Sequence, residues 1–328
     1  EKMENNLTVN KSAYSSDDYE NNVSIYIIKI IMFLWICGGN GLVITAYLKY
    51  KTLQSATNYW ILHLAIADFS MGLVLILELC GTVFFDGTWK EYDIPPAVFF
   101  IVCAILEFCY ISTVWMSLLT LVGITVDRYI AIFWPLRYPN IMTYNTARAA
   151  VGAMWGLVIG YSVVTILEWH LRSVSSGEIG FCVPDYNGYS IVPMFIFTAI
   201  VMIILYTRIF TVVHKQSKMI DPHEDTSTNH EETVVKKISR KNLIIIKTAV
   251  IVIGIFLICW IPMIVLTGLY LWDPSDLVNE LLPNMYEYVW LITMGNSGVN
   301  PLIYSYRLKP FRKAFCKLLH IKTRNQDD

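Results

Sequence analysis

The clearest chemical feature of the sequence is Asp68, a carboxylic acid in the middle of a long apolar stretch. An ionisable group in nonpolar surroundings is costly, so such a residue is a functional candidate by default. Oxygen-bearing side chains recur at a matching depth of other apolar stretches, at Ser117, Asn296, Ser297 and Asn300, with Asn40 in the first stretch. Oxygen ligands suit a hard cation. The alternative is a buried carboxylate that is merely hydrogen-bonded to Asn40 and Asn300.

Two further acids, Glu78 and Glu107, also lie in apolar stretches. In a helix, ten residues place Glu78 about 15 Å beyond Asp68. If both acids lie at the same end of the folded chain, they would together bind a cation, such as an amine, a basic peptide or a metal ion. In the alternative interpretation one of them pairs with Arg172 or His170, or Glu107 extends its carboxylate toward water.

Several other kinds of chemistry lack support. The six His and seven Cys are scattered, without a CxxC pair or an HExxH motif, so no transition-metal site is indicated. No nucleophile, base and orienting group gather in one segment, and an enzyme is therefore not expected. The net charge of −1 gives no support for nonspecific binding of nucleic acid.

The elements that position these residues follow from composition. Apolar and aromatic residues make up 55% of the chain and charged residues 16%, which is typical of a polytopic membrane protein. A membrane span needs about 20 apolar residues and must be helical, because unpaired backbone groups are costly in lipid. The sequence therefore predicts an all-α fold, a seven-transmembrane helix bundle, with spans near 23–48, 58–84, 97–132, 147–168, 189–213, 243–272 and 283–306.

A short amphipathic helix is expected after the last span, at 308–320. Phe311, Phe315, Leu318 and Leu319 share one face there and basic residues occupy the other, a pattern typical of a helix in the inner membrane interface. Cys316 on this helix is a candidate for palmitoylation. The chain then divides into an N-terminal tail (1–22), the bundle (23–306) and an amphipathic helix with a cytoplasmic tail (307–328).

Basic residues and sequons predict the orientation. With the N-terminus outside, the outer side holds Lys2, Lys11, Lys29, Lys90 and Arg172, and the other 20 of the 25 Lys and Arg lie inside. The outer tail would carry glycosylation sequons at Asn6, Asn10 and Asn22. Cys103 and Cys182 would then both face an oxidising compartment, and a bridge between them is expected. The residues before the sequons do not predict a cleavable signal peptide, and the sequence begins with Glu1 and not with Met. We expect either a trimmed N-terminus or insertion directed by the first span itself.

Six short motifs follow one another along the spans: GNGLV at 39–43, LAIAD at 64–68, DRY at 127–129, Trp155, CWIP at 259–262 and NPLIY at 300–304. Together with Cys103 and Cys182, they resemble the rhodopsin-like (class A) G-protein-coupled receptors over about 23–320. The segments DRYIAIFWPLRY and NSGVNPLIYSYRLKPFRKAF look most like amine and adenosine receptors.

This resemblance implies a receptor in the plasma membrane, whose partners are an extracellular ligand, a heterotrimeric G protein, arrestin and membrane lipid. It implies a sodium ion, favouring the resting state, at Asp68, Ser117, Asn296, Ser297 and Asn300; no other cofactor is expected. The activation switch would comprise Asp127, Arg128, Tyr129, Phe256, Trp260, Pro262 and Tyr304.

Two departures from the family pattern carry predictions. Many relatives restrain the arginine of the DRY motif with an acid at the start of span six, but Asn242 stands at that position. We therefore expect measurable basal signalling. In span five, aligning on Tyr206 places Thr198 where a proline is usual; the alternative aligns on Pro193 and replaces the usual tyrosine with Val201.

The ligand pocket is expected at the outer ends of the spans. Tyr110 stands where amine receptors hold a carboxylate, so amine binding in the usual geometry is not expected. The candidate ligand-binding residues are Glu78, Glu107, Tyr110, Val114, Trp260, Met263, Thr267, Tyr286, Glu287 and Trp290.

Three alternative functions can be compared with the receptor interpretation. An opsin needs a lysine in span seven, which this span lacks. A transporter or channel would commonly show paired repeats, and none is evident. A constitutively active receptor without a ligand is the alternative within the same family.

Overall fold

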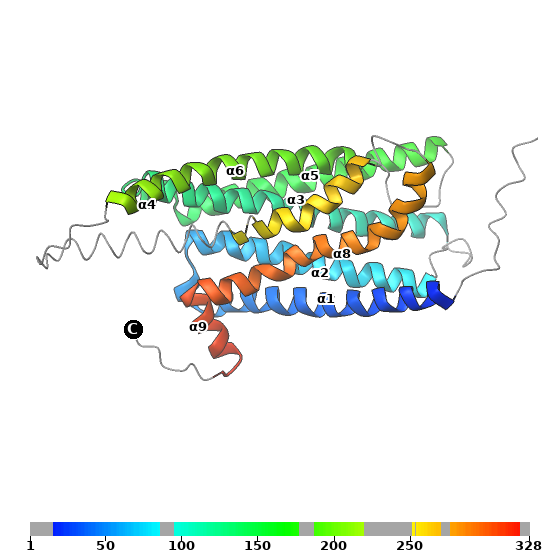
Figure 1. The fold of residues 1–328 in the computed structure, drawn as a ribbon, viewed down its shortest axis with the longest axis horizontal. Coiled ribbons are helices and arrows are strands. Elements are labelled where there is room, and N and C mark those ends of the chain that lie inside the picture. Colours follow the sequence, from blue (N-terminus) through cyan, green and yellow to red (C-terminus); the bar gives the residue numbers. More distant parts are fainter. Residues whose placement is uncertain are drawn as a thin grey trace, which may run out of the picture.

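The computed structural model describes residues 16–85, 95–176, 187–219, 251–252, 254–269 and 276–321. Within these ranges every regular element is a helix. Long helices run side by side and alternate in direction along the chain (Figure 1). The long helices are α1 (Ser16–Lys49), α2 (Ala56–Phe85), α3 (Pro96–Phe133), α5 (Tyr144–Ser176), α6 (Asn187–Met219) and α8 (Asp276–Arg307), together with the helical stretch Gly254–Leu269.

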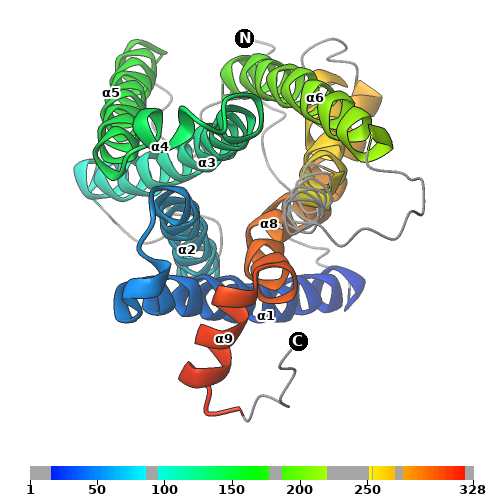
Figure 2. The ribbon, with the colours of Figure 1, turned by 90° about the vertical axis from the view of Figure 1, so that its left-hand side faces the viewer.

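Viewed along its length, the bundle is a ring of helices around a common interior (Figure 2). Because the helices alternate in direction, α1, α3, α6 and α8 all begin at one end. We call this the Lys29 end, and the opposite end, where α3 finishes, the Arg128 end. Two short helices, η1 (Lys51–Leu53) and α4 (Tyr138–Ile141), connect longer ones at the Arg128 end.

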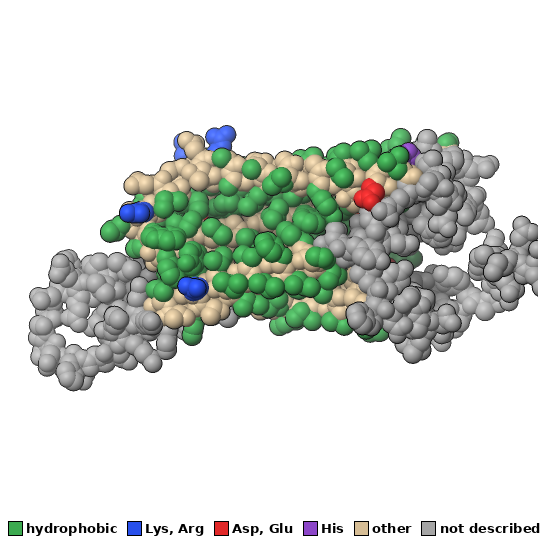
Figure 3. Space-filling view, turned by 90° about the horizontal axis from the view of Figure 1, so that it is seen from above, with side chains coloured by type: hydrophobic (Ala, Val, Ile, Leu, Met, Phe, Trp, Pro, Cys, Tyr) green, Lys and Arg blue, Asp and Glu red, His purple; other side chains and the backbone are tan. Residues whose placement is uncertain are grey.

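The outer surface is suited to lipid. In the described part of the chain five helical stretches are long and apolar enough to cross a membrane: Val23–Lys49, Ala56–Cys80, Phe100–Phe133, Tyr144–Leu171 and Val192–Val212. Large apolar side chains such as Leu34, Leu157 and Phe197 point outward and are more than half exposed. Hydrophobic side chains cover the middle of the face in Figure 3. In water this exposure would be unfavourable, whereas in a bilayer it is expected.

The predicted spans coincide with these helices, which extend beyond them at several ends: α8 begins at Asp276, before the predicted 283, and α5 ends at Ser176, after the predicted 168. The predicted span 243–272 lies partly outside the described residues. Helix α1 begins at Ser16, seven residues before the predicted span, so part of the predicted tail is helical. The most apolar part of α1 nevertheless begins at Val23, as predicted. The polar residues before it continue the same helix without belonging to the apolar span.

Polar contacts tie the helices together inside the bundle. The Asn40 amide on α1 donates to the Ser297 carbonyl oxygen on α8 at 3.0 Å. Trp155 Nε1 on α5 donates to His63 Nδ1 on α2 at 3.1 Å. These contacts fix neighbouring helices at defined rotations about their axes, which apolar packing alone specifies less strictly.

Helix α9 (Lys309–Leu318) confirms the predicted amphipathic helix at the Arg128 end. Phe311 and Phe315 are buried, and Phe311 packs 6.0 Å from Tyr304 between ring centroids. The four basic residues Lys309, Arg312, Lys313 and Lys317 are exposed, as predicted. Leu319 is the exception to the predicted apolar face, because α9 ends at Leu318 and Leu319 is 55% exposed.

Candidate functional site: a switch, a polar pocket and an acidic cup

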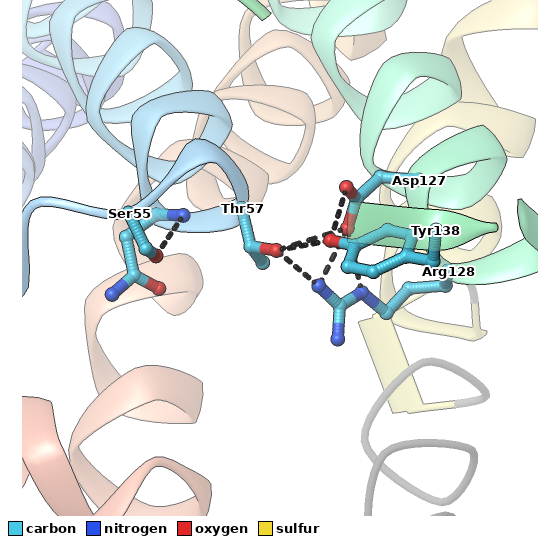
Figure 4. A network of polar contacts seen from close by, with 6 residues as sticks. Ser55, Thr57, Asp127, Arg128 and Tyr138 are labelled. Atoms are coloured by element: carbon cyan, nitrogen blue, oxygen red, sulfur yellow. Dashed lines mark hydrogen bonds and ion pairs between the residues drawn. The ribbon is translucent and has the colours of Figure 1, made fainter. Parts of the chain in front are cut away.

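A four-residue network restrains Arg128 at the end of α3 (Figure 4). Asp127 is fully buried and accepts a hydrogen bond from Arg128 Nε at 2.9 Å, so these two neighbouring residues of the DRY motif form an ion pair. Arg128 also donates to Thr57 Oγ1 on α2 at 2.6 Å. The arginine is therefore held between its own helix and α2.

Tyr138, at the start of α4, completes this network. Its hydroxyl donates to Asp127 Oδ1 at 2.9 Å and lies 2.9 Å from Thr57 Oγ1. Burial raises the pKa of the Tyr138 hydroxyl above its ordinary value of 10.0, so it remains a protonated donor at physiological pH. The sequence prediction missed Thr57 and Tyr138; Tyr138 follows DRY by nine residues, but that spacing alone does not reveal the contact.

The predicted polar pocket assembles around Asp68. This side chain is fully buried and accepts hydrogen bonds from Asn300 Nδ2 at 2.7 Å and from Ser117 Oγ at 3.4 Å. The Ser297 side chain also forms a hydrogen bond with Asp68. Helices α2, α3 and α8 thus place carboxylate, hydroxyl and amide groups around one point, a donor set that fits a hard cation.

Two asparagines do not contact Asp68 directly. Asn40 donates to the backbone of Ile36 and Ser297, so the alternative of a carboxylate bonded to Asn40 and Asn300 holds for Asn300 and not for Asn40. The buried Oδ1 atom of Asn40 has no hydrogen-bond partner among the described residues. Asn296 is buried as well, at 6% exposure.

Two aromatic residues of the predicted activation switch lie in a group of packed rings. Phe256 and Trp260 lie one turn apart with ring centroids 6.1 Å apart, and Phe195 on α6 stacks on both, at 5.3 and 6.0 Å. Phe195 was not predicted. It belongs to a buried stripe of α6 at helical spacing, which could have identified it: Phe195, Thr198, Ala199, Met202 and Ile209.

Pro262 and Tyr206 also mark helix contacts in this region. Proline at 262 weakens the preceding backbone hydrogen bonds, and the Thr293 hydroxyl on α8 donates to the Cys259 carbonyl oxygen at 3.2 Å.

On α6, Pro193 lies inside the helix, and Tyr206 accepts a hydrogen bond from Thr125 of α3 at 3.4 Å. This inward position of Tyr206 agrees with the alignment that places Thr198 at the usual proline position.

At the Lys29 end a buried lysine joins three helices. Lys29 is 3% exposed; its Nζ donates to Glu78 Oε1 on α2 at 3.0 Å and lies 2.9 Å from Glu287 Oε2 on α8. The sequence prediction treated Lys29 as an orientation signal at the end of span one. Its position six residues inside an apolar stretch was the signal that could have identified it.

Lys29 is a partner of Glu78 that the sequence prediction did not include. One of the two acids, Glu78 or Glu107, was expected as an alternative to pair with Arg172 or His170, and the structure shows an ion pair between Glu78 and Lys29. His170 packs against the Phe100 ring, with centroids 4.2 Å apart, and the Arg172 side chain lies outside the described residues. The cause is helix geometry: α1 turns Lys29 inward toward α2 and α8.

Aromatic rings and a third carboxylate complete what we call the acidic cup, formed by Lys29, Glu78, Glu107, Glu287, Tyr110, Tyr286 and Trp290. Trp290 packs 5.0 Å from Tyr110 and stacks 6.2 Å from Tyr286. Glu107 is 8% exposed. Electrostatic interactions connect the Tyr286 hydroxyl with Glu78, Glu287 and Glu107, so the charges of all three carboxylates act on this part of the bundle.

The remaining predicted wall residues are Val114, Met263 and Thr267. Val114 and Met263 are buried in the same apolar core as Trp260, and Thr267 is half-buried. Val114 and Met263 therefore form the base beneath the cup.

Cys103 is buried and disulfide-bonded, whereas its predicted partner Cys182 lies outside the described residues. Cys316 is a half-buried free cysteine on α9. Asn6, Asn10 and Asn242 also lie outside the described residues, and Asn22 falls within α1. No cluster of three or more His, Cys, Asp or Glu suited to a metal ion occurs in the part of the chain that was described.

Comparison with known proteins agrees with this arrangement. A family model described as 7 transmembrane receptor (rhodopsin family) matches residues 39–304. The human adenosine receptor A2b is 26% identical, over 92% of this chain and 91% of the relative. The D(1B) dopamine receptor of Xenopus laevis is 29% identical, over 88% of this chain and 68% of the relative. This chain therefore belongs to the rhodopsin family of seven-transmembrane receptors, the G-protein-coupled receptors that bind extracellular ligands.

Proposed function

We propose that this receptor binds a small cationic ligand in the acidic cup. The observation that carries the proposal is the placement of Glu78 on α2 and Glu287 on α8 against one ammonium, that of Lys29, with Glu107 in electrostatic interaction with the neighbouring Tyr286. Aromatic faces stabilise ammonium groups, and carboxylates supply the opposite charge. Aromatic walls with a few polar anchors are also usual for small-ligand sites.

The cup would open to the outside, with the N-terminus extracellular and the receptor in the plasma membrane. Most Lys and Arg residues fall in segments assigned to the Arg128 end, which supports a cytoplasmic location of that end. On the face in Figure 3, the visible Lys and Arg side chains also lie toward one end of the molecule. The basic face of α9 would rest on anionic inner lipid.

Signal transfer would use two packings of the bundle. In the ligand-free state the Thr57–Asp127–Tyr138 network holds Arg128. Ligand contacts in the cup would favour a state in which the helix carrying Trp260 moves outward. Arg128 would then leave the network and line a cleft for the G protein, and for arrestin afterwards.

A sodium ion in the Asp68 pocket would favour the resting packing. The groups that would hold it are the side-chain oxygens of Asp68, Ser117 and Ser297 and the side chain of Asn300. The unpartnered Asn40 Oδ1 nearby supports a pocket with spare acceptor capacity. Bound there, sodium supplies a charge that compensates the buried carboxylate.

A receptor that signals without ligand is the second candidate, because no acid stands at position 242. The Arg128–Thr57 hydrogen bond argues against full constitutive activity, since it supplies a restraint of another kind.

The proposal is tested by screening amines and their uncharged analogues for receptor-dependent G-protein nucleotide exchange. For any amine agonist found, Glu287→Gln and Glu107→Gln should reduce potency roughly 10- to 100-fold, the usual scale for a hydrogen bond to a charged group. Glu168→Gln is the matched control, because Glu168 is an exposed acid on α5. Unchanged potency in both cup variants would remove the cationic ligand from the proposal.

A further inference from the structure

Lys29 is buried more deeply than the carboxylates that it contacts. Its side chain is 3% exposed, whereas those of Glu78 and Glu287 are 36% and 40% exposed. The two carboxylates therefore contact a lysine on their buried side and remain reachable on the other. An ammonium entering from the opening would meet the same two groups that Lys29 already occupies.

Lys29 uses only one oxygen of Glu287. Its Nζ donates to Glu78 Oε1 at 3.0 Å and lies 2.9 Å from Glu287 Oε2. A carboxylate has about four acceptor sites on its two oxygens, so Glu287 can accept from more than one cation.

Burying an ammonium group is costly unless opposite charges and hydrogen bonds compensate for it. Lys29 meets this requirement by using two carboxylates from two other helices. Loss of its charge would leave both carboxylates with excess negative charge toward the cup. The lysine therefore controls the electrostatic field that an incoming ligand experiences.

We propose that Lys29 is the resident cation of the acidic cup and the residue that sets its charge selectivity. In the ligand-free receptor its ammonium partly compensates Glu78 and Glu287, so it weakens the attraction for external cations and reduces the repulsion of anions. A ligand ammonium shares Glu287 with Lys29 or takes its place. This inference builds on the proposed cationic ligand, but its test does not depend on knowing that ligand.

The experiment measures the charge selectivity of the cup with thiol reagents. Tyr286 is 45% exposed beside the carboxylates, so Tyr286→Cys supplies a reporter thiol. In cell-surface receptor carrying this change, a trimethylammonium-ethyl and a sulfonato-ethyl methanethiosulfonate are compared by their rates of modification at residue 286. Mass spectrometry of the peptide separates this thiol from the native cysteines.

Adding Lys29→Met should raise the ratio of cationic to anionic rates roughly tenfold, as expected when a charge is removed a few ångströms from a partly buried site. Lys29→Arg keeps the charge and should leave the ratio within about twofold of the parent. An unchanged ratio in the Lys29→Met receptor would overturn the proposal, because the lysine would then not govern the field in the cup.

Lys29→Met removes a buried cation from two partly exposed carboxylates and can prevent folding. In that case the rate ratio is compared between two receptors that both carry Glu287→Gln, one with and one without Lys29→Met. Glu287→Gln removes one negative charge, so the loss of Lys29 leaves less charge uncompensated. The double variant should again show the higher ratio. Equal ratios, or failure of both Lys29→Met receptors to reach the cell surface, would identify Lys29 as a structural brace and overturn the proposal.

The two proposals fail in different measurements. A ratio that rises as expected, together with amine potencies unaffected by Glu287→Gln, would retain Lys29 as the selectivity residue and reject the cationic ligand. Amine potencies that fall in Glu287→Gln, together with an unchanged reagent ratio, would reject the role of Lys29 alone.

Discussion

The guanidinium of Arg128 donates a hydrogen bond to the Thr57 hydroxyl at 2.6 Å and so joins the end of α3 to the start of α2. Tyr138 approaches the same hydroxyl from α4. This contact restrains the switch arginine from a direction that does not involve the segment containing Asn242. In this structure Arg128 is therefore held between α2 and α3, and we expect this contact to favour the resting state of the receptor.

Removal of this contact should raise basal signalling. In Thr57→Ala, Arg128 loses a hydrogen bond between a charged donor and a hydroxyl, and the active packing becomes relatively more populated. We expect basal G-protein nucleotide exchange to rise roughly two- to tenfold at equal surface expression. Thr45→Ala is the control, because the Thr45 hydroxyl bonds only to the Gly41 carbonyl of its own helix among the described contacts. Equal basal activity in the two variants would show that the Thr57 contact does not restrain the switch.

An acid introduced at position 242 should have the opposite effect. Asn242→Glu supplies the carboxylate that many relatives place opposite the switch arginine, and its charge would stabilise Arg128 in the resting packing. Because an accessible ion pair contributes only about 0–1 kcal/mol, we expect basal exchange to fall by no more than about fivefold. Asn242→Gln, which adds length without charge, should leave it unchanged. The prediction fails if the glutamate and glutamine variants signal equally without ligand, or if wild-type receptor signals no more than cells that lack it.

The parts of the fold that depend on composition and local periodicity could be predicted from the sequence. The apolar lengths indicated the spans, and the 3–4-residue spacing of Phe311 and Phe315 indicated α9. The Asp68 pocket was predictable because costly polar groups in apolar spans need partners, and few were available at that depth.

Contacts that depend on how far each helix rotates about its axis could not be predicted. Lys29 could have faced lipid headgroups or the interior, and only the packing of α1 against α2 and α8 decides this. Likewise, the distance between Tyr138 and Thr57 depends on where the chain turns after α3. A single sequence contains no record of such pairings.

Sodium should stabilise the receptor through Asp68. In detergent and without agonist, wild-type receptor should show a thermal midpoint roughly 2 °C or more higher in sodium chloride than in choline chloride of equal ionic strength. Asp68→Asn should remove the difference, because the neutral amide cannot compensate a cation. Ser70→Ala is the matched control, since Ser70 lies on α2 and bonds to the Ile66 carbonyl oxygen. An equal sodium effect in wild type and Asp68→Asn would place the ion elsewhere.

Glycine at position 123 should be required for the packing of α3 against α2. A Cβ atom there would lie 2.7 Å from Cε3 of Trp60 and closer still to another atom of that ring, and Trp60 is only 3% exposed. Since the buried indole has little room to move, Gly123→Ala should destabilise the receptor by about 1–3 kcal/mol despite the better helix propensity of alanine. Gly160 on α5 has open space around its Cα, so Gly160→Ala should leave the thermal midpoint equal or slightly higher. If Gly123→Ala melts at the wild-type temperature in detergent, Trp60 can move aside and the helices are less tightly packed at this crossing than the structure indicates.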